Sequence, residues 1–330
     1  MYLATLPKFP LAVLPTPLQR LHNLEAELGP GTPRIWMKRD DLTGLAFGGN
    51  KARKLEYLVA DALSQGATVL VSEGAVQSNH ARMTAAAARV AGMRCVLVLD
   101  AQHGANVVGN LLLDEMLGAD VRITPDRTER NALMSSIGDE LRTAGEAPYV
   151  IPTGGSVPLG AASYVAAVAE TLEQLRAAGE APASLFFASG SLGTQAGLVV
   201  GARAFSAPFT VEGVAVLHPV EQLIERCAAL ATATAEMIGL DASFTAADIR
   251  LDGTHIGEAY GLATPEGLDA IRLLARTEAI FLDPVYSGKA MAAMLAAIRS
   301  GRYTADDSVL FLHTGGGPSL FAFGEALLAS

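Results

Sequence analysis

The chain has 330 residues, of which 50% are hydrophobic and 18% are charged, so it can form a sizeable core and intrinsic disorder is excluded. Its formal net charge of −10 disfavours a nucleic acid as partner. No apolar run reaches the ~18 residues that a membrane-spanning helix needs, and the N-terminal segment has no signal-peptide pattern. We therefore expect a cytoplasmic protein with neither a nucleic-acid nor a membrane partner.

Two cysteines, Cys95 and Cys227, are too few for a disulfide framework. Cys95 lies in the apolar run CVLVLD, where we expect a buried structural thiol. The six histidines show no spacing typical of metal ligands, so we predict no metal site.

The order of short apolar runs and helix-periodic segments predicts an α/β fold with mostly parallel strands. Prolines near 7–18 and 30–33 first indicate an extended N-terminal segment that runs over the body. The segment 51–63 then has the apolar periodicity of an amphipathic helix. Seven runs have the profile of strands buried on both faces: 68–72, 95–100, 120–124, 149–152, 184–189, 210–216 and 309–314.

The segment FGGNKARK, residues 47–54, places Lys51 at the start of the first predicted helix. A cation is unfavourable there, because the N-terminal end of a helix carries partial positive charge. Two interpretations fit. One is a lysine of lowered pKa that acts as a nucleophile or forms a Schiff base, and the other is a solvated lysine in a basic first turn.

The segment EGAVQSNHAR, residues 73–82, places Ser78, Asn79 and His80 at a second predicted helix N-terminus. Their hydroxyl, amide and backbone N–H groups suit a carboxylate ligand. The alternative is that Ser78 or Asn79 only caps the helix and that His80 is a hydrogen-bonded structural histidine.

The segment ASGSLGTQAGL, residues 188–198, follows a predicted strand and opens a helix. The hydroxyls of Ser189, Ser191 and Thr194 and the free N–H groups of the helix N-terminus predict a phosphate site. An ordinary tight turn is the alternative. The glycine spacing fits neither a dinucleotide-binding fingerprint nor a Walker A loop.

Two further turns, LDPVYSGKAM at 282–291 and HTGGGPSL at 313–320, complete a characteristic order of motifs. The chain resembles the fold type II pyridoxal-phosphate (PLP) enzymes, and more narrowly the family of D-cysteine desulfhydrases and 1-aminocyclopropane-1-carboxylate (ACC) deaminases. The segments that carry the resemblance are PLAVLPTPLQRL, KRDDLTGLAFGGNKARKLEYL, GAVQSNHAR, IPTGGSVPLGAASYV, ASGSLGTQAGL, LARTEAIFLDPVYSGKAM and HTGGGPSLFAF.

The resemblance implies a fold like that of the tryptophan synthase β subunit, with two open, twisted, mostly parallel sheets flanked by helices. It implies a small α/β domain of residues 48–164 and a large PLP-binding domain of residues 1–47 plus 165–330, with the active site in the cleft between them. It also implies a homodimer.

By the same resemblance, Lys51 would bind PLP as a Schiff base, and Asn79 would contact the 3′-oxygen of PLP. Either Ser287 or Thr314 would meet the nitrogen of the pyridine ring. The other residues expected to bind the cofactor, mainly at its phosphate, are Asn50, Lys54, Ser189, Gly190, Ser191, Leu192, Gly193 and Thr194.

On the substrate side, the resemblance implies that Ser78, Asn79 and the backbone through His80 hold the carboxylate of a small amino acid. Tyr286 would stack on the pyridine ring and Tyr260 would line the substrate site. The implied catalytic residues are Lys51, Ser78 and Tyr286.

The choice of substrate depends on two departures from the deaminase pattern. ACC deaminases have YEGK and QSNQ, whereas this chain has Ser287 in YSGK and His80 in QSNH. A thiolate is a good leaving group, whereas opening the ACC ring needs a ring nitrogen that a carboxylate keeps protonated. We therefore expect an α,β-eliminating lyase that converts D-cysteine to pyruvate, hydrogen sulfide and ammonia. ACC deaminase and L-cysteate sulfo-lyase are the alternatives, and for the second Arg82 is either a sulfonate-binding group or an exposed arginine.

Overall fold

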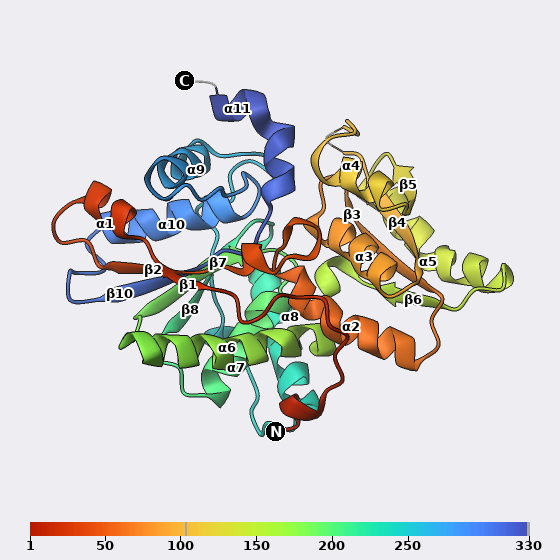
Figure 1. The fold of residues 1–330 in the computed structure, drawn as a ribbon, viewed down its shortest axis with the longest axis horizontal. Coiled ribbons are helices and arrows are strands. Elements are labelled where there is room, and N and C mark those ends of the chain that lie inside the picture. The colour runs from red at the N-terminus through yellow and green to blue at the C-terminus, as the bar shows by residue number, and fades with distance from the viewer. Residues whose placement is uncertain (103, 329–330) are drawn as a thin grey trace.

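The computed structural model describes every residue except 103, 329 and 330, and it contains two sheets. Figure 1 shows the two sheets side by side, each flanked by helices. The six-stranded sheet has the order β1-β2-β10-β7-β8-β9, and the four-stranded sheet has the order β5-β4-β3-β6. All strand pairs are parallel except β1 with β2, in agreement with the predicted α/β class.

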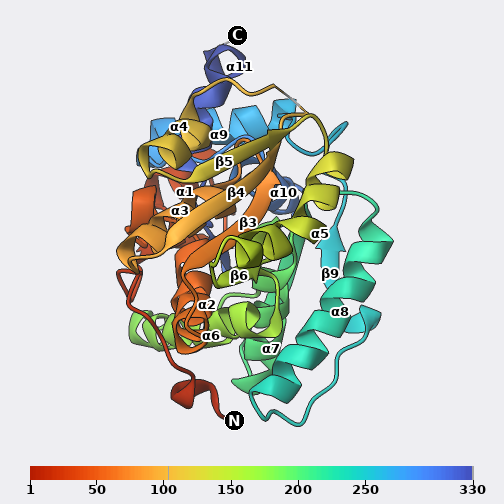
Figure 2. The same cartoon turned by 90° about the vertical axis from the view of Figure 1, so that its right-hand side faces the viewer.

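The smaller sheet lies toward the viewer in Figure 2, between its helices. Its strands are β3 (Val69–Ala75), β4 (Arg94–Asp100), β5 (Asp120–Thr124) and β6 (Pro148–Ile151). The helices of this part of the chain are α2 (Lys51–Ser64), α3 (Asn79–Val90), α4 (Gly109–Met116) and α5 (Arg127–Thr143). All these elements fall within residues 48–164, the range that we propose as the smaller domain, although Ala161, Ala162 and Tyr164 at its end pack in the core of the larger sheet.

The larger sheet is covered by helices on both faces. Its strands are β1 (Leu18–Arg20), β2 (Arg34–Lys38), β7 (Ser184–Ser189), β8 (Thr210–Ala215), β9 (Arg250–Asp252) and β10 (Ser308–Leu312). One core cluster includes side chains of α6 (Pro158–Ala178), α7 (Gly193–Ala204) and α8 (Val220–Met237). The cluster on the other face includes side chains of α1 (His22–Leu28), α9 (Pro265–Glu278) and α10 (Ser287–Arg299). The last helix is α11 (Gly324–Leu328).

Each of the seven predicted strands forms within one or a few residues of its expected bounds, but three strands of the larger sheet were missed. Strands β1 and β9 are edge strands of three residues each, too short to show a pattern. Strand β2, RIWMK, has a basic residue at each end, which interrupts the apolar run that identifies buried strands.

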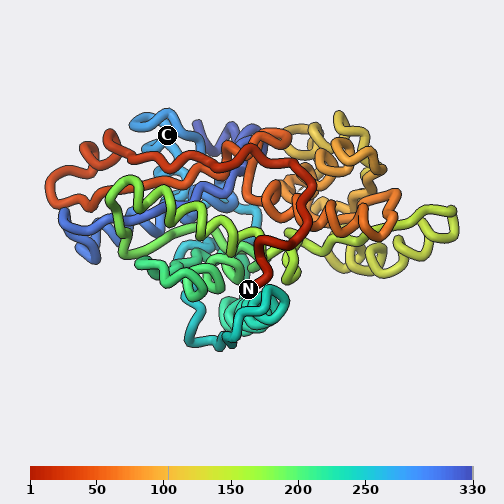
Figure 3. The backbone as a smooth tube through the Cα atoms, turned by 60° about the horizontal axis from the view of Figure 1, so that its bottom comes forward, coloured from red at the N-terminus to blue at the C-terminus, as the bar shows by residue number. Residues whose placement is uncertain are grey.

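The N-terminal segment is extended and lies along the outside of α2, in agreement with its proline content (Figure 3). Phe9 N donates to Glu56 O at 2.8 Å, and the backbone N–H groups of Leu11 and Ala12 donate to the Glu56 carboxylate. Cys95 and Cys227 are both buried, free thiols. Within the described residues, no helix is long and apolar enough to cross a membrane.

A buried ionic network fastens the first turn of α2 to the larger domain. Arg53 donates to both oxygens of Asp40, at 2.8 and 2.9 Å, and to both oxygens of Glu170 at 2.8 and 2.9 Å. Tyr164 donates to Asp40 at 2.6 Å, and Lys38 donates to Glu170 at 2.5 Å. Burial alone would raise the pKa of Asp40, but the charge of Arg53 and these hydrogen bonds hold it below its usual value.

Replacing Asp40 by alanine should lower the free energy of unfolding by about 3 kcal/mol, because it removes one of the two carboxylates that neutralise the buried Arg53 and leaves Arg53 with Glu170 alone. Urea denaturation followed by circular dichroism would measure the loss. Asp139→Ala is the control, since Asp139 pairs with Arg142 on the surface with 84% of its side chain exposed, and it should change stability little. Equal effects of the two substitutions would contradict the role given to the network.

Candidate active site

The predicted site residues lie mainly on loops and first helical turns. Hydrogen bonds join the loops next to the smaller sheet to the loops next to the larger sheet. Asn50, which precedes α2, donates through Nδ2 to Thr194 Oγ1 at 3.0 Å. Its backbone N–H donates to Thr314 O at 2.9 Å. The loop before α2, the start of α7 and the turn after β10 therefore meet at one place.

Lys51 is the first residue of α2 and is partly exposed. Its Nζ donates to Asn50 Oδ1 at 2.8 Å. Burial and the nearby charge of Arg82 lower the pKa of Lys51 to about 8, and the charge of Asp283 opposes the shift. This environment favours a reactive amine over a solvated lysine in a basic first turn.

The loop before Lys51 has an unusual backbone. Ala46, Phe47, Gly48 and Gly49 all have positive φ, at 42°, 68°, 70° and 132°. A Cβ on Gly48 would lie 2.0 Å from the backbone oxygen of Asp41, so only glycine fits at that position. This strained run determines where α2 begins and therefore where the Lys51 amine lies.

Lys54 belongs to the first turn of α2, and its amine lies beside the N-terminus of α7. Its Nζ donates to Gly154 O at 3.0 Å, and a Cβ on Gly193 would lie 2.8 Å from this nitrogen. Burial lowers the pKa of Lys54 well below its usual value, and the charge of Lys51 lowers it further. An anion bound beside Lys54 would favour the protonated amine.

The turn before α7 presents unpartnered backbone donors beside that lysine. The N–H of Gly193 donates to Ser156 Oγ at 3.2 Å. The N–H groups of Ser191, Leu192 and Thr194 have no hydrogen-bond partner among the described residues. Together with the positive end of the α7 dipole, these groups form an arrangement suited to a phosphate.

The hydroxyl of Ser189 is not available at this turn, contrary to expectation. Ser189 is buried at the end of β7 and donates to Gln195 Oε1 at 2.6 Å. The hydroxyl of Ser191 instead accepts a hydrogen bond from Ser156 at 2.8 Å. Ser156 was not predicted as a site residue, although its TGGS turn directly follows a predicted strand.

At the second turn, Ser78 is the N-cap of α3, and its Oγ accepts from Ala81 N at 3.2 Å. His80 is buried, and its Nε2 lies 3.0 Å from Ser72 Oγ, which itself donates to the backbone of Ile151. Burial lowers the pKa of His80 well below its usual value, and the charges of the site lysines lower it further. The side chain of Ser78 therefore caps the helix, and the side chain of His80 is a hydrogen-bonded structural histidine, as the alternative interpretation proposed.

Arg82 is fully buried, so it is neither an exposed arginine nor a free cation for a sulfonate. Its guanidinium donates to Asn79 Oδ1 at 2.9 Å, to Asn110 Oδ1 at 2.6 Å and to Gly48 O at 2.9 Å.

The two predicted tyrosines lie together. The hydroxyls of Tyr260 and Tyr286 are 2.5 Å apart, and their rings meet edge to face with centroids 6.0 Å apart. Burial raises the pKa of both hydroxyls, so both stay protonated at neutral pH. Lys289 is fully buried and donates to Ile256 O at 2.6 Å, which anchors the loop that carries Tyr260.

Ser287 and Thr314, the two expected partners of a ring nitrogen, differ in how their hydroxyls are used. Ser287 Oγ donates to Asp283 Oδ1 at 2.6 Å and accepts from Asp283 N at 2.8 Å. The hydroxyl of Thr314 makes no hydrogen bond to a described residue. Asp283 is fully buried and also accepts from the backbone of Val285 and Tyr286. Asp283 was not predicted as a site residue, although a carboxylate just before a helix is a capping signal.

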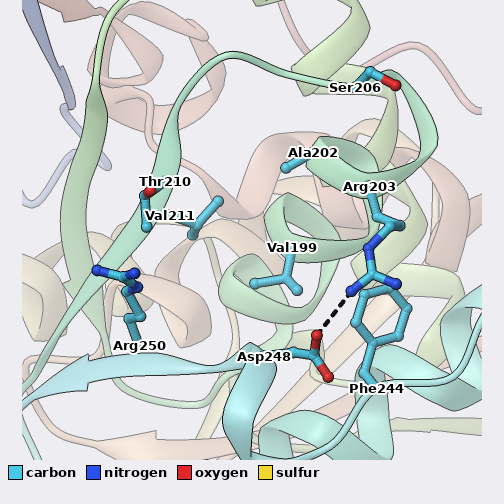
Figure 4. Close-up of a pocket in the computed structure, with 9 residues that line it drawn as sticks. All are labelled: Val199, Ala202, Arg203, Ser206, Thr210, Val211, Phe244, Asp248 and Arg250. Atoms are coloured by element: carbon cyan, nitrogen blue, oxygen red, sulfur yellow. Dashed lines mark hydrogen bonds and ion pairs between the residues drawn. The ribbon is translucent and has the colours of Figure 1, made fainter.

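A separate cavity of about 330 Å³ lies at the surface of the larger domain. Figure 4 shows it between Arg250 on one side and the Arg203–Asp248 ion pair with Phe244 on the other. It contains none of the predicted site residues.

The donor set of the site fits a PLP cofactor, which combines an aldehyde, a phosphate and an aromatic ring. The Lys51 amine suits the aldehyde, and the α7 turn with Lys54 suits the phosphate. The ring of Tyr286 lies beside this turn, since a Cβ on Gly190 would lie 3.5 Å from its Cε1, and it suits the aromatic ring of the cofactor.

Comparisons with known proteins agree with this arrangement. The family described as "Pyridoxal-phosphate dependent enzyme" matches residues 10–315. D-cysteine desulfhydrases of Salmonella typhi and Salmonella newport (strain SL254) are each 40% identical over 327 residues, which cover 98% of this chain and 98% of theirs.

Solved structures confirm the expected fold. A protein described as an ACC deaminase homologue superposes with a TM-score of 0.90 at 38% identity, over 99% of this chain and 97% of its own. A threonine deaminase superposes with a TM-score of 0.66 at 22% identity, over 91% and 92% of the two chains, and shows a likeness of fold alone.

The lowered pKa of Lys51 predicts how fast an added aldehyde attaches to the cofactor-free protein. Only the unprotonated amine reacts, so the rate should rise about tenfold per pH unit in acid and level off near pH 8. Absorbance after mixing with pyridoxal phosphate at a series of pH values would measure it, with Lys51→Ala to subtract the other lysines. A rate that keeps rising to pH 10 would contradict the assignment.

Proposed function

The chain belongs to the family of pyridoxal-phosphate dependent enzymes, in the group that includes D-cysteine desulfhydrases and ACC deaminases, and from this premise we propose that it cleaves D-cysteine. The products are pyruvate, hydrogen sulfide and ammonia. The observation that carries the proposal is the Lys51 amine, of lowered pKa, bound to Asn50, whose side chain joins it to Thr194 in the turn with unpartnered backbone donors.

Pyridoxal phosphate, when bound, supplies an aldehyde for the amine and a ring that accepts electrons from the α-carbon. Lys54 and the N–H groups of Ser191, Leu192 and Thr194 hold its phosphate. Asn79 donates to an oxygen on its ring, and Tyr286 packs against the ring. Thr314 meets the ring nitrogen, which is supported by its uncommitted hydroxyl.

The N-terminus of α3 holds the carboxylate of the amino acid. The backbone N–H groups of Asn79 and His80 have no partner among the described residues, and both belong to the first turn of a helix. The carboxylate is thereby oriented so that the α-proton faces Lys51. With a pKa of about 8, the Lys51 amine is suited to accept that proton at neutral pH.

The β-sulfur leaves without strong acid assistance, because a thiol has a pKa of about 8.5 and its thiolate is a good leaving group. The paired hydroxyls of Tyr260 and Tyr286 line this side of the site and remain protonated. One hydroxyl of the pair donates to the other, so Tyr286 can donate its own proton to the departing sulfur while it accepts from Tyr260.

The alternatives are supported less well. ACC deamination is supported by the likeness to an ACC deaminase homologue, but position 287 holds a serine bound to Asp283, where ACC deaminases have a glutamate. Sulfite release from L-cysteate needs a cation for the sulfonate. The internal hydrogen bonds of Arg82 remove the one candidate that the sequence offered.

The assembly follows from the family resemblance alone, and the cellular location is the expectation of the sequence analysis. We propose a homodimer that works in the cytoplasm on a small amino acid, with the active site between the smaller domain and the rest of the chain.

The test is the 2-oxo acid formed from D-cysteine, L-cysteine, ACC and L-cysteate, each supplied separately with pyridoxal phosphate. Pyruvate with an equal amount of sulfide should form from D-cysteine, and Lys51→Ala should lower the rate by at least about 100-fold. Release of 2-oxobutyrate from ACC at a comparable rate would support the deaminase instead. The absence of any 2-oxo acid would overturn both assignments.

A further inference from the structure

A fully buried arginine lies directly beneath the turn that we assign to the cofactor and substrate. The guanidinium of Arg82 donates through Nη1 to the side-chain oxygens of Asn79 and Asn110, at 2.9 and 2.6 Å. Through Nη2 it donates to the backbone oxygen of Gly48 at 2.9 Å, three residues before Lys51. One side chain therefore links α3, α4 and the loop that carries the reactive lysine.

The direction of these hydrogen bonds follows from a backbone carbonyl. Asn110 Nδ2 lies 2.8 Å from the backbone oxygen of Gln77, which can only accept a hydrogen bond. The amide nitrogen of Asn110 must therefore face Gln77, and its Oδ1 must face Arg82. The side chain of Gln77 also binds Asn110, since its Oε1 accepts from Asn110 N at 2.9 Å, and this second hydrogen bond holds Asn110 in place.

The same reasoning fixes the amide of Asn79. Its Oδ1 accepts from Arg82 Nη1 and from Asn110 Nδ2, at 2.9 and 3.1 Å. Both neighbours are donors, so a flipped Asn79 amide would place a donor against two donors. The Nδ2 group of Asn79 makes no hydrogen bond to a described residue, and the residue is partly exposed.

We propose that Arg82 and Asn110 are positioning residues, which hold the amide of Asn79 so that its N–H group rather than its oxygen faces the bound cofactor. The inference rests on the proposed function and deepens it. A donor in this position fits a ligand oxygen that carries negative charge, such as the 3′-oxygen of pyridoxal phosphate, and it repels a ligand hydroxyl that must donate.

The guanidinium is suited to this task because its rigid planar fork carries donors on two separate nitrogens, so it reaches the amides of Asn79 and Asn110 on one side and Gly48 O on the other, whereas an ammonium group is a single point. Asp114 is buried near Arg82, but neither of its oxygens has a hydrogen-bond partner among the described residues, and burial raises its pKa to about 8. The Nη donors of Arg82 are therefore directed at the amide oxygens rather than at this carboxyl. The charge of Arg82 also contributes to the lowered pKa of Lys51.

The test is a double-mutant cycle of Arg82→Lys with Asn79→Ala, measured as the affinity of the cofactor-free protein for pyridoxal phosphate. Arg82→Lys keeps the positive charge and removes the fork. Each single variant should weaken binding by about tenfold, the size of one charge-assisted hydrogen bond. If Arg82 acts through Asn79, the double variant binds no more than about twofold more weakly than Asn79→Ala alone. Additive losses would overturn the proposal.

A second variant tests whether the N–H group or the oxygen of the Asn79 side chain faces the cofactor. Asn79→Asp keeps an oxygen against Arg82 but replaces the donor that faces the cofactor with an acceptor. It should bind pyridoxal phosphate more weakly than Asn79→Ala and shift the pH at which the absorbance of the bound cofactor changes. Binding and absorbance equal to wild type would mean that the oxygen, and not the N–H group, faces the ligand.

Control measurements distinguish a failure of the proposed function from a failure of this inference. Arg89→Lys makes the same chemical change on an exposed part of α3, where Arg89 donates to the backbone oxygens of 117 and 118, and it should bind as wild type. If Arg82→Lys does not fold, Asn110→Ala takes its place in the cycle. A wild-type protein that does not bind pyridoxal phosphate would sink the proposed function, whereas wild-type binding with an additive cycle would sink only this inference.

Discussion

The buried contact of Arg53 with Asp40 and Glu170 is the constraint on which the site depends. It holds the first turn of α2 to the larger domain, whereas Leu55 and Leu58 of the same helix belong to the core of the smaller domain. The helix is therefore shared by both parts of the molecule. Because it begins at Lys51, the amine of that residue, to which we assign the chemistry, lies at the boundary between the two sheets, next to loops from both.

The site gathers more buried positive charge than the protein alone neutralises. Lys51 and Lys54 lie one turn apart, Arg82 lies beneath them, and the negative charge of Asp283 only partly compensates. Burial lowers the pKa values of both lysines, the charge of Arg82 lowers that of Lys51 further, and the charge of Lys51 lowers that of Lys54 further. A bound dianionic phosphate would supply the missing charge at Lys54, while Lys51 keeps a neutral fraction that can react with an aldehyde. Charge balance thus accounts for both the phosphate binding at Lys54 and the reaction of Lys51 with an aldehyde that we propose.

Local patterns in the sequence predicted the elements and the main site turns, but not the partners of the side chains. The β-rich runs SLFFAS and DVRIT identified β7 and β5 to the residue, because composition and length are local properties, although only β7 is buried along its whole length. The hydrogen bond of Ser189 was not predictable. Its hydroxyl meets the side chain of Gln195 only after the strand and the following helix have packed together. Arg82 was misjudged for the same reason: its acceptors at Gly48 and Asn110 come from distant parts of the chain.

The most direct test of the account is to identify the lysine that binds pyridoxal phosphate. The chain has only five lysines, Lys8, Lys38, Lys51, Lys54 and Lys289, and the last four are buried or partly buried. Borohydride reduction of the loaded protein, followed by peptide mass spectrometry, would convert the reversible link into a stable label. We predict the label on Lys51 alone. A label on Lys54, three residues further along α2, or on any other lysine would contradict the account.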